Sequence, residues 1–221
     1  MDSLWWQIFD ILGTLAFSLS GTLVAISRRM DIFGVFVLAA ATAIGGGIMR
    51  DIILGNFPPI AFQKDIYFAI IIFTIALTSI GIRYFDTRLR QNVMHYSLLF
   101  YLLCDAVGLG SFTVTGTLMG CYYFPDHWMF DITLGTLTAV GGGVVRDVLA
   151  GRVSKLFKHD IYATASIAGA IALQFSYVCL EQSAVSSAFL GFIITVTIRM
   201  LAISFKFNLP RVKKKRNSQF F

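Results

Sequence analysis

The chain is short of charged residues, prolines and cysteines. Charged residues make up 14% of its 221 positions, and there are only four prolines and three cysteines, whereas a soluble domain has about a quarter charged residues. So few cysteines exclude a disulfide-stapled secreted fold. The apolar share is 57% and the mean hydropathy is +0.75, too apolar for a disordered scaffold or for one soluble core. We therefore expect most of the chain to face lipid.

Apolar runs predict an all-α integral membrane protein with seven transmembrane helices. A helix needs about 20 apolar residues to cross a bilayer, so seven helices use roughly 140 to 160 positions and leave no room for an appended soluble domain. The predicted helices span residues 4–26, 32–54, 65–85, 96–121, 128–150, 160–180 and 184–205. No basic stretch precedes the first apolar run, so we expect it to remain as a helix rather than to be cleaved as a signal peptide.

Basic residues gather in alternate loops. They follow the first, third, fifth and seventh predicted helices, at Arg28, Arg29, Arg83, Arg88, Arg90, Arg152, Lys155, Lys158, Lys206, Arg211, Lys213, Lys214, Lys215 and Arg216. In the opposite loops the only basic residue is Lys64. Cytoplasmic loops are enriched in lysine and arginine, so we expect an inner (plasma) membrane protein with its N-terminus outside and its C-terminus in the cytoplasm. This topology explains the net charge of +6 without a nucleic-acid partner.

The sequence contains an internal repeat. TAIGGGIMRDIILG at 42–55 returns as TAVGGGVVRDVLAG at 138–151, and flanking motifs recur at the same spacing of 95 to 96 residues. Each copy holds three predicted helices, and because three is odd, the second copy must enter the membrane from the opposite side. Inverted repeats are typical of transport proteins, with the path at the repeat interface. The predicted units are a first three-helix repeat (1–92), a second, inverted repeat (93–181), a seventh helix (182–206) and a basic cytoplasmic tail (207–221).

Three consecutive glycines lie past the middle of the second helix and again in the fifth, at Gly45, Gly46, Gly47, Gly141, Gly142 and Gly143. Each glycine in a helix costs about 1 kcal/mol relative to alanine, so a triplet is expected to kink or unwind the helix and expose its carbonyl groups. Exposed carbonyls at membrane depth need protein or water to satisfy them, which favours a polar path. The alternative is that these small residues allow two helices to pack closely.

Ionisable residues within the predicted helices are expensive unless they are paired or hydrated. Six of them lie at or near the repeated motifs: Asp10, Arg50, Asp51, Asp105, Arg146 and Asp147. From their depths we predict ion pairs Asp10–Arg50 and Asp105–Arg146, with Asp65 and Asp160 as rival partners. Successive residues point about 100° apart on a helix, so neither arginine is expected to pair with the aspartate that follows it. The predicted pairs either gate the path or only brace the helices.

Hydroxyl side chains at matching positions of the two repeats suit the same path. The candidates are Ser18, Thr42, Thr113 and Thr138, and each offers a donor and an acceptor. Hydrogen bonding between helices is their alternative role. The sequence has no HExxH, P-loop or TVGYG motif, and inversion would separate Asp51 from Asp147. We therefore expect no enzyme activity, no cofactor and no metal beyond transient K⁺ or Na⁺.

The doubled GGGxxRD motif, on the second and fifth of seven helices, resembles the prokaryotic branch of the trimeric intracellular cation (TRIC) channel family. The same domain family includes bacterial proteins labelled glycine transporters. The resemblance covers about residues 5–205 and implies a homotrimer in which each protomer has its own pore for K⁺ and Na⁺. It also implies that helices two and five, kinked at the glycine triplets, line that pore.

Animal members of the TRIC family bind a phosphoinositide through basic residues beside the fifth helix. Arg152, Lys155 and Lys158 occupy a similar region, while GGGVVRD replaces the animal lysine–glutamate–valine motif. The resemblance therefore implies an ordinary anionic phospholipid as a partner. The leading interpretation is a monovalent cation channel. The alternative is a carrier for glycine or another small neutral amino acid, in which Arg50 or Arg146 meets the substrate carboxylate.

Overall fold

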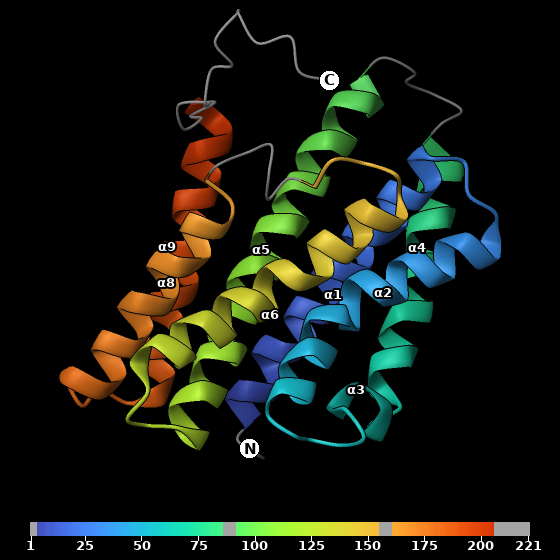
Figure 1. The fold of residues 1–221 in the computed structure, drawn as a ribbon. Coiled ribbons are helices and arrows are strands. Elements are labelled where there is room, and N and C mark those ends of the chain that lie inside the picture. The colour runs from blue at the N-terminus through green and yellow to red at the C-terminus, as the bar shows by residue number, and fades with distance from the viewer. Residues whose placement is uncertain (1–3, 86–91, 155–160, 206–221) are drawn as a thin grey trace, which may run out of the picture.

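The structure is a computed structural model that describes residues 4–85, 92–154 and 161–205, with the side chains of 82–97 excepted. Within these ranges all regular secondary structure is helical (Figure 1). The elements are α1 (Leu4–Ser27), α2 (Ile32–Ile53), α3 (Ile60–Gln63), α4 (Ile66–Phe85), α5 (Asn92–Tyr123), α6 (Trp128–Leu149), α8 (Ala163–Gln174), the π-helical turn η1 (Phe175–Cys179) and α9 (Ala184–Phe205). The expected all-α architecture is confirmed.

Each of the seven predicted apolar ranges coincides with helix, and no end is displaced by more than four residues. The short helix α3 and the π-helical end of α8 were not predicted, because a single turn carries no apolar periodicity. Five helices are long and apolar enough to cross a membrane: α1, α2, α5, α6 and α9. The apolar parts of the other two are shorter, at Ile66–Gly81 and Ala163–Cys179. The number of membrane crossings therefore remains a prediction.

The two glycine-containing helices α2 and α6 end in the same way. Gly55 and Gly151 follow their last turns with φ of +72° and +62°, a conformation that glycine adopts without strain. The next residue then bonds back to the helix: the backbone N–H of Asn56 donates to the Asp51 carbonyl, and that of Arg152 donates to the Asp147 carbonyl, each at 2.8 Å. This is a Schellman ending, and it places each RD pair in the last turns of its helix.

The helices form two groups around a shared interior. α1 packs against α2 and α4, while α5 packs against α6 and α8, and contacts between α1 and α5 and between α2 and α6 join the groups. In Figure 1, α1 and α4 run upward and α2 runs downward, whereas α5 and α8 run downward and α6 runs upward. Corresponding helices of the two sequence repeats therefore run in opposite directions. α9 packs against α5 and α8.

The distribution of side chains is reversed relative to a soluble protein. Large apolar residues such as Phe73 and Ile193 are more than half exposed, whereas Arg50 and Arg146 are the largest side chains among those fully buried. Soluble proteins almost never bury a charged residue fully unless it is paired. The exterior suits lipid, and the charged interior indicates where the function lies.

Candidate functional site

One buried cluster of charge surrounds Arg50, near the C-terminal end of α2. Its Nη1 donates to Asp10 Oδ1 of α1 at 3.2 Å, and its Nε donates to Asp51 Oδ1 at 2.9 Å. The other carboxylate oxygens are also used. The Tyr67 hydroxyl donates to Asp10 Oδ2 at 2.5 Å, and the backbone N–H of Ile60 donates to Asp51 Oδ2 at 2.8 Å. α1, α2, α3 and α4 therefore meet at one arginine.

A second cluster surrounds Arg146, near the C-terminal end of α6. Its Nη1 donates to Asp105 Oδ1 of α5 at 2.6 Å, and its Nε donates to Asp147 Oδ1 at 3.0 Å. The same Nη1 donates to the Ser20 hydroxyl of α1 at 2.6 Å. The predicted ion pairs Asp10–Arg50 and Asp105–Arg146 are therefore both confirmed.

The expectation that each arginine avoids the aspartate after it is wrong. Arg50 bonds Asp51 and Arg146 bonds Asp147, both through Nε. The side-chain directions of successive residues differ, but the guanidinium group stands at the end of a long flexible stem and presents donors on several edges. Nε can turn back to the neighbouring carboxylate while Nη1 reaches the adjacent helix. The rival Asp65 is exposed, and Asp160 lies outside the described residues.

An aromatic ring covers each arginine. The Arg50 guanidinium carbon lies 5.4 Å from the centroid of the Trp6 ring, and that of Arg146 lies 5.4 Å from the centroid of the Tyr101 ring. Both distances fit a cation–π contact. Trp6 and Tyr101 are 95 residues apart in the chain, so the covering rings belong to the repeat as well.

The two clusters differ in how their tyrosines are bonded. Tyr67 donates to Asp10 in the first cluster, whereas the hydroxyl of Tyr162, its counterpart in the repeat, is buried without a hydrogen-bond partner. Nη2 of Arg146 is also buried and unpartnered. A Cβ placed on Gly143 would lie 2.7 Å from the Tyr162 hydroxyl and 3.7 Å from this Nη2. The second cluster therefore keeps two unused polar groups close to one glycine.

The glycine triplets do not unwind their helices. α2 is helical from Ile32 to Ile53 and α6 from Trp128 to Leu149, so the predicted unwinding is wrong. The middle glycines instead lie where α2 and α6 cross. A Cβ on Gly46 would stand 2.0 Å from the Thr138 carbonyl oxygen, and one on Gly142 would stand 2.2 Å from the Thr42 carbonyl oxygen. The alternative interpretation, close helix packing, is supported, because the backbones of α2 and α6 approach each other where no side chain lies between them.

The predicted hydroxyls are buried and bonded to protein. Thr42 and Thr138 each donate to a carbonyl one turn back in their own helix, at 2.6 Å. Ser18 bonds Thr74 of α4, and Thr113 bonds Ser166 of α8 at 2.7 Å. The bonds of Ser18 and Thr113 fit the interhelical role, whereas those of Thr42 and Thr138 stay within one helix. A role as ion ligands stays a prediction for all four.

Cavities lie on one side of the Arg50 cluster. A cavity of about 10 Å³, the room of one water molecule, is lined by Asp10, Arg50, Tyr67 and Phe112 among others. A larger one of about 350 Å³ is lined by Trp6, Asn56, Lys64 and Tyr123 among others. Trp6 lines the larger cavity and its ring covers Arg50, so the cluster lies directly behind this opening.

The predicted lipid-binding residues are described only in part. The Arg152 Nη2 donates to the Ser27 hydroxyl at the end of α1, at 2.9 Å. Lys155, Lys158 and the tail 207–221 lie outside the described residues. In the part of the chain that the structure describes, no three His, Cys, Asp or Glu side chains are grouped to hold a metal ion.

The sequence analysis missed the aromatic members of both clusters. Trp6, Tyr67, Tyr101 and Tyr162 were not named as site residues, although their spacing of 95 residues carries the signal. It also missed a buried arginine of α9, Arg199, which lies 4.9 Å over the ring of Tyr162. Arg199 has no counterpart in the repeat, but its charge within the predicted helix 184–205 was a signal that could have found it.

Comparison with known proteins agrees with this geometry. The family model described as glycine transporter matches residues 7–83 and again residues 102–178, the same spacing as the internal repeat. The two matches together cover more than half of the chain. The chain belongs to the glycine transporter family.

Curated members of the glycine transporter family carry the name UPF0126. The chain is 35% identical over 210 residues to a UPF0126 membrane protein of Vibrio cholerae, covering 95% of this chain and 84% of the relative. It is 32% identical over 210 residues to the UPF0126 inner membrane protein YadS of Escherichia coli K12, covering 95% and 97%. A membrane protein is therefore the common description.

Solved structures relate this glycine transporter family member to TRIC channels. The chain superimposes with a TM-score of 0.75 and 32% identity on a TRIC cation channel studied for conductance, covering 95% of this chain and 98% of that chain. A prokaryotic TRIC channel in 0.5 M KCl gives a TM-score of 0.78 at 30% identity, covering 92% and 98%. The TRIC orthologue of Rhodobacter sphaeroides gives 0.77 at 27% identity, covering 91% and 98%. The fold is that of the TRIC channels.

Proposed function

We propose that the protein is a monovalent cation channel whose path runs between the two three-helix units, past Arg50 and Arg146. The observation that carries this proposal is the composition of the clusters: each surrounds one arginine with two aspartates in ion-pair contact. With the carboxylates ionised, one positive and two negative charges leave a formal charge of −1 in each cluster. Negative charge along a path favours cations and repels anions.

The antiparallel directions of corresponding helices support an inverted repeat, with seven crossings and with α9 outside the repeats. Inversion puts one cluster near each end of the path, and the basic loops place the N-terminus outside and the C-terminus in the cytoplasm. The likeness to TRIC channels supports a homotrimer with one pore in each protomer, and K⁺ and Na⁺ as the ions. Ser18, Thr42, Thr113 and Thr138 are proposed to line that pore with the glycine triplets.

Both charge clusters lie in a closed interior in this structure. Arg50 and Arg146 are 2% and 0% exposed, and the cavity beside Arg50 holds about one water molecule. Conduction therefore requires the charge clusters to rearrange, and we assign them the role of gates. An anionic phospholipid held by Arg152, Lys155 and Lys158 is proposed as a partner near the cytoplasmic end.

Ion flux through purified protein tests the proposal. In planar bilayers with a KCl gradient, the protein should give unitary currents whose reversal potential favours K⁺ over Cl⁻. Asp51→Asn removes the excess charge of the first cluster and leaves the Arg50–Asp10 pair in place, so the reversal potential should move towards zero. Asp65→Asn, at an exposed site, is the matched control and should not move it. A folded trimer that passes no current, or that passes K⁺ and Cl⁻ alike, contradicts the proposal.

A carrier for glycine is the second candidate, and one observation favours it. Nη2 of Arg146 and the Tyr162 hydroxyl are buried without partners, and together they suit a small carboxylate. The commitment of Arg146 to Asp105 and Asp147 weighs against it, because their charges already neutralise the guanidinium. Saturable uptake of labelled glycine into proteoliposomes, absent in Arg146→Ala, would establish the carrier in place of the channel.

A further inference from the structure

We propose that Phe17 of α1 and Phe112 of α5 form an apolar gate in the middle of the path, between the two charge clusters. This inference rests on the proposed channel function and adds a barrier that none of the charged residues supplies. The two phenylalanines are 95 residues apart, so they occupy the same position in the two repeats. Their rings contact each other, with centroids 5.3 Å apart and planes at 57°.

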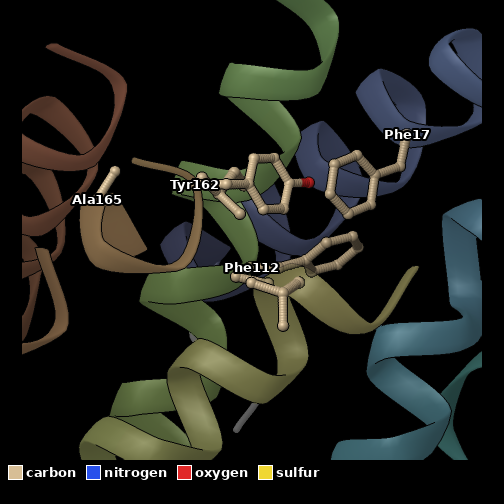
Figure 2. Packing of buried hydrophobic residues seen from close by; sticks show 7 residues of the cluster. Phe17, Phe112, Tyr162 and Ala165 are labelled. Carbon is tan, nitrogen blue, oxygen red and sulfur yellow. The ribbon is translucent and has the colours of Figure 1, made fainter. Parts of the chain in front are cut away.

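The rings close the interior completely at this point. Phe17 is 0% and Phe112 2% exposed, and both belong to a cluster with Leu109, Val140 and Tyr162. Figure 2 shows the two rings side by side, with the Tyr162 hydroxyl pointing toward Phe17. The two phenyl rings themselves offer an ion no hydrogen-bonding or charged ligand.

Polar groups flank the ring pair on both sides. Phe112 lines the water-sized cavity together with Arg50 and Tyr67 of the first cluster. Phe17 packs with Tyr162, whose hydroxyl and Arg146 Nη2 both lie close to Gly143. The order along the path is therefore charged cluster, two phenyl rings, charged cluster. Apolar constrictions of this kind gate channels by expelling water.

Glycines lie directly against the two phenyl rings. A Cβ on Gly108 would stand 2.1 Å from Phe17 Cδ1, and one on Gly142 would stand 3.1 Å from Phe17 Cδ2. Gly13, the counterpart of Gly108, faces Phe112 with ring atoms 3.1 Å from its own Cβ position. Each ring thus packs against the backbone of the other helix. A shift of α1 relative to α5 would therefore displace both rings at the same time. Gly142 therefore has a second role beside the crossing of α2 and α6.

A polarity series at Phe17 distinguishes a gate from ordinary core packing. Valine and threonine have nearly the same shape, so Phe17→Val and Phe17→Thr leave the same space and differ in one hydroxyl. Because a hydroxyl holds water in the constriction, the threonine variant should raise resting K⁺ efflux from proteoliposomes about tenfold over wild type. Phe17→Val should stay within about twofold of wild type, since an apolar constriction still expels water. Phe112→Thr and Phe112→Val repeat the comparison in the other half.

Phe9 supplies the matched control. It is buried in the same helix, its ring contacts Phe189 and Phe192 of α9, and the apolar cluster around it contains no residue of either charge cluster. Phe9→Thr should leave K⁺ efflux at the wild-type rate. Equal efflux through the valine and threonine variants, at both positions, overturns the gate, as does an equal rise in Phe9→Thr.

The same experiments distinguish a failure of the proposed channel function from a failure of the gate alone. If neither wild type nor the threonine variants carry K⁺ above protein-free vesicles, the channel itself is refuted. If wild type conducts and the threonine variants do not exceed it, only the gate is refuted. Should Phe17→Thr not fold, the Phe112 pair decides, since the two positions are equivalent in the repeat.

Discussion

The burial of Arg50 and Arg146 carries a large free-energy cost. Removing an ion from water costs several kcal/mol, and deleting one partner of a buried pair costs about 3–5 kcal/mol. Each guanidinium is therefore surrounded: a carboxylate of its own helix at Nε, a carboxylate of a neighbouring helix at Nη1, and an aromatic ring over its face. Charge so arranged is stabilised in the closed interior, and in the proposed channel it is available to a passing cation.

Ser20 is the residue that ties the first repeat to the second cluster, and its removal should loosen that cluster. Ser20→Ala deletes the acceptor for Arg146 Nη1, and a hydrogen bond to a charged group contributes about 1.5–3 kcal/mol. We expect a lower unfolding temperature in detergent and a higher open probability in bilayers. Thermal unfolding and single-channel recording measure the two effects.

Thr115, the counterpart of Ser20 in the repeat, is the control for that substitution. Its hydroxyl donates only to the Phe112 carbonyl, at 3.5 Å, so Thr115→Ala should change stability and open probability much less. Equal effects of the two alanine substitutions would show that the Ser20–Arg146 bond does not hold the cluster closed.

The crossing of α2 and α6 is the decisive contact between elements. The middle glycine of each triplet faces a threonine carbonyl of the opposite helix, so the two helices meet backbone to backbone. Dispersion contacts between the two closely packed backbones offset the conformational-entropy cost of placing glycines within a helix. The crossing also places the RD pairs of both helices relative to the interior.

Alanine substitution within one triplet should separate packing from helix propensity. Gly46→Ala places a Cβ 2.0 Å from the Thr138 carbonyl oxygen, and such overpacking costs about 1–3 kcal/mol. Gly45→Ala meets nothing closer than 3.9 Å and gains up to about 1 kcal/mol of helix propensity. We therefore expect Gly46→Ala to lower the unfolding temperature and Gly45→Ala to keep or raise it. If both glycines respond alike, a bend in α2, rather than the crossing, is the reason for the triplet.

At the scale of the whole molecule, the start of α1 and the junction of η1 and α9 lie at one end. Trp5 at the start of α1 packs in one cluster with Tyr177 and Ala184, at the junction of η1 and α9. These two regions are far apart in the chain, yet they lie at the same end of the molecule (Figure 1). Under the proposed topology this end faces the outside.

A native cysteine can test that orientation. Cys179, at the end of η1, is exposed, whereas Cys104 and Cys121 are buried. A membrane-impermeant maleimide should therefore label Cys179 in intact cells. In a Cys179→Ser background, Arg28→Cys on the opposite side should be labelled only after permeabilisation. The reverse pattern in both variants would invert the proposed topology.

Hydropathy and repetition were sufficient to predict the helices and the main ion pairs. A helix in lipid must satisfy its backbone internally and hide its charges, so apolar runs mark the spans, and an aspartate and an arginine at one depth must find each other. These two rules predicted the ion pairs Asp10–Arg50 and Asp105–Arg146, and each pair is the counterpart of the other in the repeat.

The tertiary structure alone decided which groups complete the site. Three features depend on how closely helices approach and on which way long side chains turn. They are the bond of each arginine to the aspartate that follows it, the cover of Trp6 and Tyr101 over the arginines, and the crossing of α2 and α6 at Gly46. The same composition allows an unwound helix or a tight crossing, because both satisfy the local preferences of glycine. The sequence by itself determined apolar runs, repeats and charge; packing between distant helices decided that the middle glycines of α2 and α6 lie at a close crossing of two continuous helices.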